Sequence, residues 1–101
     1  MNTVEVTFVR IYLTEAEGLL DDLLSHLHDQ EKVQGVTVLR AISGFGKSGK
    51  MHSASLMDMS LDLPLVIEFF DAPGKVNIIL EHIRTMLEPG HIVCWSATLA
   101  V

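Results

Sequence analysis

Residues 37–71 read TVLRAIS, then GFGKSGKMHSASLMDMS, then LDLPLVIEFFD, which are two β-like runs separated by a polar, glycine-rich insert. The flanking runs are rich in Val, Ile, Leu and Phe, as strands are. The insert spans residues 44–60 and shows little apolar periodicity. Connections in small domains are usually shorter than this, and long ones are commonly functional. We therefore expect a functional loop between two strands.

Four further elements surround this loop. A capping box of Thr14 and Glu17, followed by leucines at helical spacing, predicts a helix after the first strand. Asp71 as a cap and Pro73 in the first turn predict a second helix. The predicted strands cover residues 3–13, 36–43, 63–71 and 91–101. The order βαββαβ predicts one α+β domain over residues 1–101, a ferredoxin-like sandwich with both helices on one sheet face.

The predicted strands are apolar on both sides. In the third strand Leu65, Ile67 and Phe69 share one side, and Val66 and Phe70 share the other. The helices can cover only one face, so the other is expected to be buried between subunits. The mean hydropathy of +0.36 agrees with such an assembly.

Charged residues also occur inside these strands. Arg10 and Arg40 belong to the strands expected on either side of the one that carries Glu68. They either form a charge ladder at the subunit interface or extend separately to water. If Val38 faces that interface, a charge introduced there should disrupt the assembly.

Composition excludes several classes of protein. The 13 acidic and 7 basic side chains give a formal net charge of -6 over 101 residues, which argues against a nucleic-acid partner. The single cysteine, Cys94, excludes an internal disulfide and fits a reducing compartment. The histidines have no recognisable metal-binding spacing, so no metal site is expected. Without a long apolar run, we expect a cytoplasmic protein with no membrane insertion.

Two phosphate-binding motifs overlap in the insert. Gly44, Gly46 and Gly49 spell GxGxxG, and Gly44 to Lys50 spells GxxxxGK. The second motif needs Ser or Thr after the lysine to bind magnesium, and Met51 stands there instead. The first motif needs a doubly wound sheet, for which the chain is too short. The glycine amides and nearby lysines either cradle an anion or serve as a hinge.

These residues resemble those of the PII-like signalling proteins, and in particular the "domain of unknown function 190" family. The resemblance rests on TVLRAISGFGK (37–47), MHSAS (51–55) and DLPLVIE (62–68), and it covers nearly the whole chain. It implies a ferredoxin-like homotrimer whose sheets line a central core. The insert at residues 44–60 would correspond to the T-loop, which docks on target proteins and senses ligands at its base.

The resemblance also implies a ligand site. PII proteins bind an adenine nucleotide between subunits, so we expect a cleft that joins Gly44, Phe45, Gly46 and Lys47 of one chain to Gly90 and His91 of the next. The turn at residues 88–91 is shorter than the family's phosphate-binding pattern, so a nucleotide or other small anion should bind more weakly. Lys50 and His52 are expected loop contacts. His52 either meets a ligand or only forms hydrogen bonds within the loop.

These features together predict a regulatory protein and not an enzyme. No cofactor is certain, and an adenine nucleotide is the candidate ligand. The target would be another protein, and a membrane transporter or channel is the candidate because family members are often encoded with such proteins. The alternative is a small ferredoxin-like enzyme of the dimeric α/β-barrel type, whose open sheet faces enclose a substrate pocket. Three subunits would favour the regulator and two the enzyme.

Overall fold

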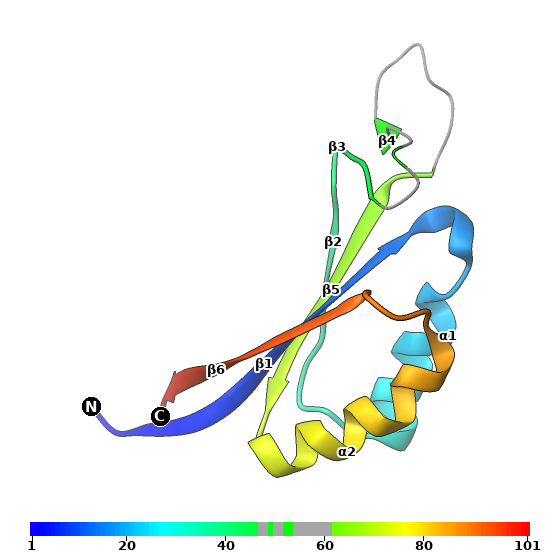
Figure 1. Cartoon of the computed structure of the whole chain (residues 1–101). Coiled ribbons are helices and arrows are strands. Elements are labelled where there is room, and N and C mark those ends of the chain that lie inside the picture. Colours follow the sequence, from blue (N-terminus) through cyan, green and yellow to red (C-terminus); the bar gives the residue numbers. More distant parts are fainter. Residues whose placement is uncertain (47–48, 50–51, 54–61) are drawn as a thin grey trace.

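An antiparallel sheet with helices on one of its faces makes up the chain (Figure 1). The structure is a computed structural model that describes residues 1–46, 49, 52–53 and 62–101. Within these residues the main sheet has four strands, in spatial order β2 (Thr37–Arg40), β5 (Pro64–Asp71), β1 (Thr3–Thr14) and β6 (Ile92–Ala100). The two α-helices of this part of the chain are α1 (Leu20–Ser25) and α2 (Pro73–Ile83). The expected ferredoxin-like βαββαβ architecture is confirmed.

The face of the sheet toward the helices carries the hydrophobic core. Alternate residues of a strand point to the same face. Ile11 of β1 is opposite Ile67 of β5, and both side chains are fully buried. The helical segments complete this layer with Leu23, Leu27, Val76, Ile79 and Ile83. We call this side of the sheet the covered face.

The segment after β1 differs from the prediction of a helix that begins after Thr14. The Thr14 N–H donates to the Glu17 carboxylate over 3.0 Å, but this capping box closes only the short 3-10 turn η1 (Glu15–Glu17). Gly18 then takes a left-handed conformation with φ of 67°, which interrupts the helical path. Helix α1 therefore begins later, and it continues as the π-helical turn η2 (His26–Gln30).

The second helix follows the prediction more closely. Pro73 lies in its first turn, as expected. Asp71 is not its cap, because the Asp71 carboxylate accepts from the N–H of Ala72 over 2.8 Å, one residue before the helix. The helix continues into the 3-10 turn η3 (Arg84–Met86). At 11 residues α2 is the longest helix described, and no helix in this part of the chain has the length and apolar character to cross a bilayer.

No described element covers the opposite side of the sheet, which we call the open face (Figure 1). Phe8 stacks on Trp95 with ring centroids 4.8 Å apart, and Phe70 lies 6.3 Å from Phe8. Arg10 lies 5.5 Å from the Trp95 ring centre. Several large apolar side chains on this face are exposed: Val4, Tyr12, Leu39, Phe70, Val93 and Trp95. The sheet is thus apolar on both sides, as the sequence predicts.

The three charged strand residues do not form one ladder. Arg10 is opposite Glu68 on the open face, and the two side chains form an ion pair of 2.9 Å. Arg40 is opposite the core residue Leu65, so it points to the covered face. Its guanidinium pairs with Glu15 in the turn after β1. The ladder through all three residues is therefore wrong, because Arg40 has the opposite strand parity from Arg10 and Glu68.

Candidate ligand-binding site at the loop base

Both ends of the glycine-rich loop lie at one end of the sheet, beside the turn before β6. Strand β1 pairs with β5 on one side and β6 on the other, so its end near Tyr12 meets the beginnings of both. The strands that flank the loop also pair with each other, and the Ala41 N–H donates to the Pro64 carbonyl over 2.9 Å. The antiparallel topology thus gathers residues 41–46, 62–66 and 88–91.

A cavity of about 690 Å³ lies among these segments. Its walls come from the end of β1 and the turn after it, the loop base, the start of β5 and the turn before β6. The lining residues are Tyr12, Leu13, Thr14, Glu17, Ala41, Ser43, Gly44, Phe45, Gly46, Asp62, Pro64, Val66, Glu88, Gly90 and His91. Most of the predicted site residues are among them.

One chain alone brings the loop base and the turn before β6 together. Gly44, Phe45 and Gly46 share the cavity with Gly90 and His91 of the same chain, whereas we expected the turn from a neighbouring subunit. The topology explains this, because β5 and β6 flank the same end of β1. Of the other predicted residues, Lys47 and Lys50 lie outside the described residues.

A short ladder closes the base of the loop. Strand β3 (Ser43–Gly44) pairs antiparallel with β4 (His52–Ser53), and Gly44 is opposite His52. A Cβ atom on Gly44 would lie only 3.2 Å from Cγ of Pro64. The close approach of loop base and β5 therefore favours glycine at this position. His52 is thus brought to the loop base by its backbone pairing.

His91 is fixed at the cavity wall by two hydrogen bonds with Tyr12. The His91 Nδ1 atom lies 2.7 Å from the Tyr12 carbonyl oxygen, and the Tyr12 N–H donates to the His91 carbonyl over 2.9 Å. A carbonyl oxygen only accepts, so Nδ1 carries the proton. In the neutral ring Nε2 is then an acceptor, which suits a hydroxyl or amino group of a ligand.

A charged clamp joins the two stems of the loop. Glu15 pairs with Arg40 at the end of β2, and it also accepts from the Leu63 N–H over 3.4 Å. The hydrogen bond from Arg40 lowers the pKa of Glu15, and the Leu63 N–H adds to this effect. Sequence reasoning missed this clamp, since its members are far apart in the chain and meet only when β2 pairs with β5.

The cavity wall is acidic. It includes the carboxylates of Glu17, Asp62 and Glu88, and His91 is the only nitrogen base among the described lining side chains. Carboxylates accept hydrogen bonds from amino and hydroxyl groups and repel phosphates. The described walls therefore suit the base and sugar of a nucleotide better than its phosphates.

Solved structures of PII-like proteins share this fold. CPII from Thiomonas intermedia K12 bound to ADP and bicarbonate has a TM-score of 0.68 and 24% sequence identity, and the comparison covers 99% of this chain and 91% of that one. CPII, described as a nitrogen regulatory PII-like protein, bound to ADP, AMP and bicarbonate, has a TM-score of 0.69 and 23% identity with the same coverage. The fold of this chain is therefore that of the PII-like proteins.

The sequence places the chain within one family of that class. It belongs to the family described as "uncharacterized ACR", the domain of unknown function 190 (DUF190), whose profile matches residues 6–99. A relative from Aquifex aeolicus (strain VF5), named UPF0166 protein, is 31% identical over 88 residues, which are 83% of this chain and 84% of the relative. The expected family is thereby confirmed.

Proposed function

We propose that this chain is a PII-like regulatory protein that forms a homotrimer and binds an adenine nucleotide beside the base of its long loop. One observation carries the proposal: the cavity is continuous with the open face. Tyr12 and Val66 are opposite each other on that face, and both also line the cavity. Burial of the open face would place a neighbouring subunit at the cavity mouth, so ligand binding and assembly would be coupled.

The lining residues favour one orientation of the nucleotide. Phe45 is largely exposed, so its ring can stack on a planar base. The acidic wall and His91 can receive the amino and hydroxyl groups of adenosine. Lys47 and Lys50 follow the loop base in the sequence, and we propose them as the cations that bind the phosphates. In this orientation the loop meets the charged end of the ligand.

The loop is the proposed contact surface for the target protein. Residues 44–60 would dock on a target protein in the cytoplasm, with a membrane transporter or channel as the candidate. The length and polarity of this segment support the assignment. Bicarbonate is the second ligand worth testing, because CPII binds it together with ADP.

Calorimetry tests the nucleotide site directly. AMP, ADP, ATP and cyclic nucleotides are titrated into the wild type, with and without bicarbonate. We expect Lys47→Ala to weaken the binding of the tightest-binding nucleotide by about 1–3 kcal/mol, the usual cost of a lost charged hydrogen bond. The matched control is Arg84→Ala, which removes a cation that is exposed in η3 and paired with Glu81. It should leave the affinity unchanged.

Two calorimetric outcomes would contradict the ligand part of the proposal. Absence of nucleotide binding by the wild type would remove the ligand assignment, and equal binding by wild type and Lys47→Ala would remove Lys47 from the site. Light scattering tests the assembly separately. A monomer or dimer at micromolar concentration would contradict the trimer, and a dimer would favour the enzyme alternative.

A further inference from the structure

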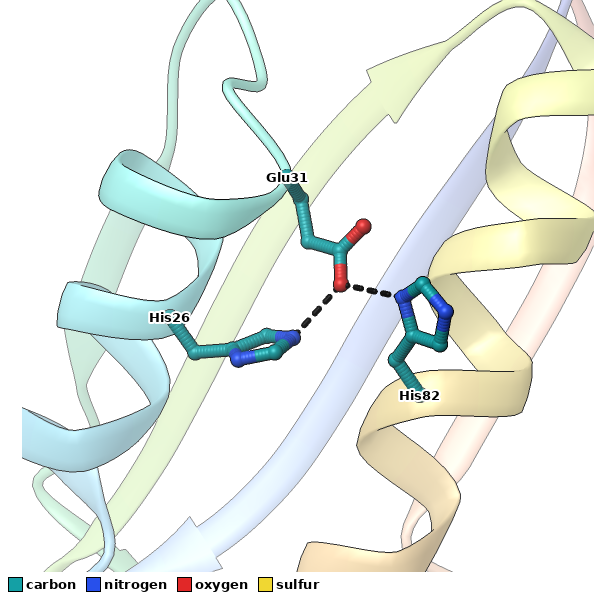
Figure 2. A group of neighbouring side chains, drawn as sticks. All are labelled: His26, Glu31 and His82. Carbon is teal, nitrogen blue, oxygen red and sulfur yellow. Dashed lines mark hydrogen bonds and ion pairs between the residues drawn. The ribbon is translucent and has the colours of Figure 1, made fainter.

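His26, Glu31 and His82 converge between the first helical segment and α2 (Figure 2). Nε2 of His26 lies 2.5 Å from Oε2 of Glu31, and Nδ1 of His82 lies 2.7 Å from the same oxygen. The two rings meet edge to face, with centroids 6.3 Å apart. Two imidazoles from different helical segments thus point at one carboxylate oxygen.

The π-helical turn η2 is the reason that His26 and Glu31 meet. In an α-helix, successive residues are about 100° apart around the axis, so residues five apart would be about 140° apart. In this turn the Glu31 N–H donates to the His26 carbonyl over 3.0 Å, an i to i+5 hydrogen bond. The wider turn places Glu31 above His26. Such turns are frequent at functional sites.

Burial distinguishes the three side chains. Glu31 is 7% exposed, His26 25% and His82 54%. The carboxylate is thus held inside, and the cluster opens to solvent on the side of His82. Two histidines and one carboxylate, with a fourth position open to water, are a ligand set that binds zinc in proteins. Imidazole also suits other divalent ions of the first transition series.

We propose that His26, Glu31 and His82 bind a divalent transition-metal ion of the Zn²⁺ class. Their ligand atoms all lie within 4.8 Å of one another. Zinc bonds of about 2.0–2.2 Å place tetrahedral ligand atoms about 3.3 Å apart. The two present hydrogen bonds must therefore lengthen by less than about 1 Å. His82 is on the solvent side and can lengthen its own contact with Glu31, whereas the contact between His26 and Glu31 opens by a shift of one of those two side chains.

Metal binding requires a defined change in protonation. In the metal-free state each nitrogen that faces Glu31 carries a proton, because the carboxylate only accepts. The ion displaces these protons: in a neutral ring the proton moves to the other nitrogen, and a doubly protonated ring releases it to water, so that each ligated ring is neutral with one N–H. A bound ion would join η2 to α2. The site uses none of the residues that line the cavity at the loop base, so it does not depend on the proposed nucleotide site.

Calorimetry with Zn²⁺ on the chelator-treated full chain tests this site. We expect one ion per chain and an unfolding temperature that rises with the Zn²⁺ concentration. His82→Ala should weaken Zn²⁺ binding at least about tenfold. Loss of a group that only hydrogen-bonds to a metal ligand already costs about 10–100-fold in affinity, and His82 is itself a proposed ligand. Glu31→Gln should do the same, although glutamine still accepts a hydrogen bond. His28→Ala is the matched control, because its exposed ring pairs with Asp29 outside the cluster.

The variants also distinguish a metal site from a purely structural link. His82 is half exposed, so His82→Ala should remain folded in chelator, and Glu31→Gln provides a second variant with nearly unchanged shape. The absorption spectrum of bound Co²⁺ should show a tetrahedral site in the wild type. His82→Ala and Glu31→Gln should each abolish this signal. No Zn²⁺ binding by the wild type would leave the cluster as a hydrogen-bonded link between helices. Equal binding by the wild type, His82→Ala and Glu31→Gln would place the ion at other histidines, and either result overturns the proposal.

Discussion

The two faces of the sheet differ in how completely one chain covers them. On the covered face, Ile11 and Ile67 lie under the helices with no exposed surface. On the open face, Leu39, Val93 and Trp95 remain between 41% and 49% exposed. The same strands supply both sets of apolar side chains, so the difference arises from what packs against them. The covered face stabilises the chain itself, and the open face is suited to contact another chain.

The largest loss of stability is expected from a substitution on the covered face. Ile67→Ala should lower the free energy of unfolding by about 2–5 kcal/mol, because the deleted atoms leave a cavity under α2. Denaturant unfolding at fixed protein concentration measures the change. The matched control is Ile78→Ala, since Ile78 lies on α2 and is 58% exposed. That change should stay within about 0.5 kcal/mol. Equal losses for the two variants would contradict the comparison of the faces.

The next effect concerns assembly through the open face. Leu39 is opposite Val66 on this face, whereas Val38 is opposite the core residue Ile67 and lies on the covered side. Leu39, and not Val38, is therefore the residue of β2 to change. Leu39→Asp should dissociate the proposed trimer, because an unpaired carboxylate would be desolvated at the proposed interface. Light scattering should then show folded monomers.

The control for assembly is a charge on the outer side of a helix. Ile78→Asp adds the same carboxylate to an exposed apolar position that the proposed interface does not use. It should leave the oligomer intact. If Leu39→Asp also leaves the oligomer intact, the open face is not the interface, and the apolar side chains on it need another explanation.

Local pattern predicted most of the fold, and tertiary contacts set the rest. The strands and α2 were evident from periodicity, and the loop base was evident from GFGK and the residues around it. The late start of α1 was missed, because the capping box at Thr14 is real but closes only a 3-10 turn before Gly18.

The metal candidate shows what spacing alone does not reveal. His26 and Glu31 are five residues apart, a separation that indicates a shared face only in a π-helical turn. His82 is added by the packing of α2 beside that turn. The histidine spacings therefore predicted no metal site, although the fold assembles a candidate ligand set from residues in two segments.

The smallest change in stability is expected from the clamp at the loop stems. There Arg40 pairs with Glu15 on the covered face, as Arg10 pairs with Glu68 on the open face. The folded pKa of Glu15 lies below its ordinary value of 4.5, chiefly because Arg40 donates to the carboxylate. A lowered folded pKa means that the clamp stabilises the fold at neutral pH, and that this stabilisation is lost as the pH falls through the folded pKa. Glu15→Gln should therefore be less stable than wild type at pH 7, and the difference should shrink below about pH 4.5. Denaturant midpoints measured from pH 7 to pH 3 for both proteins test this, with Glu81→Gln as the control on an exposed helix side chain. A difference that persists unchanged at pH 3 would mean that Glu15 acts through its shape and not through its charge.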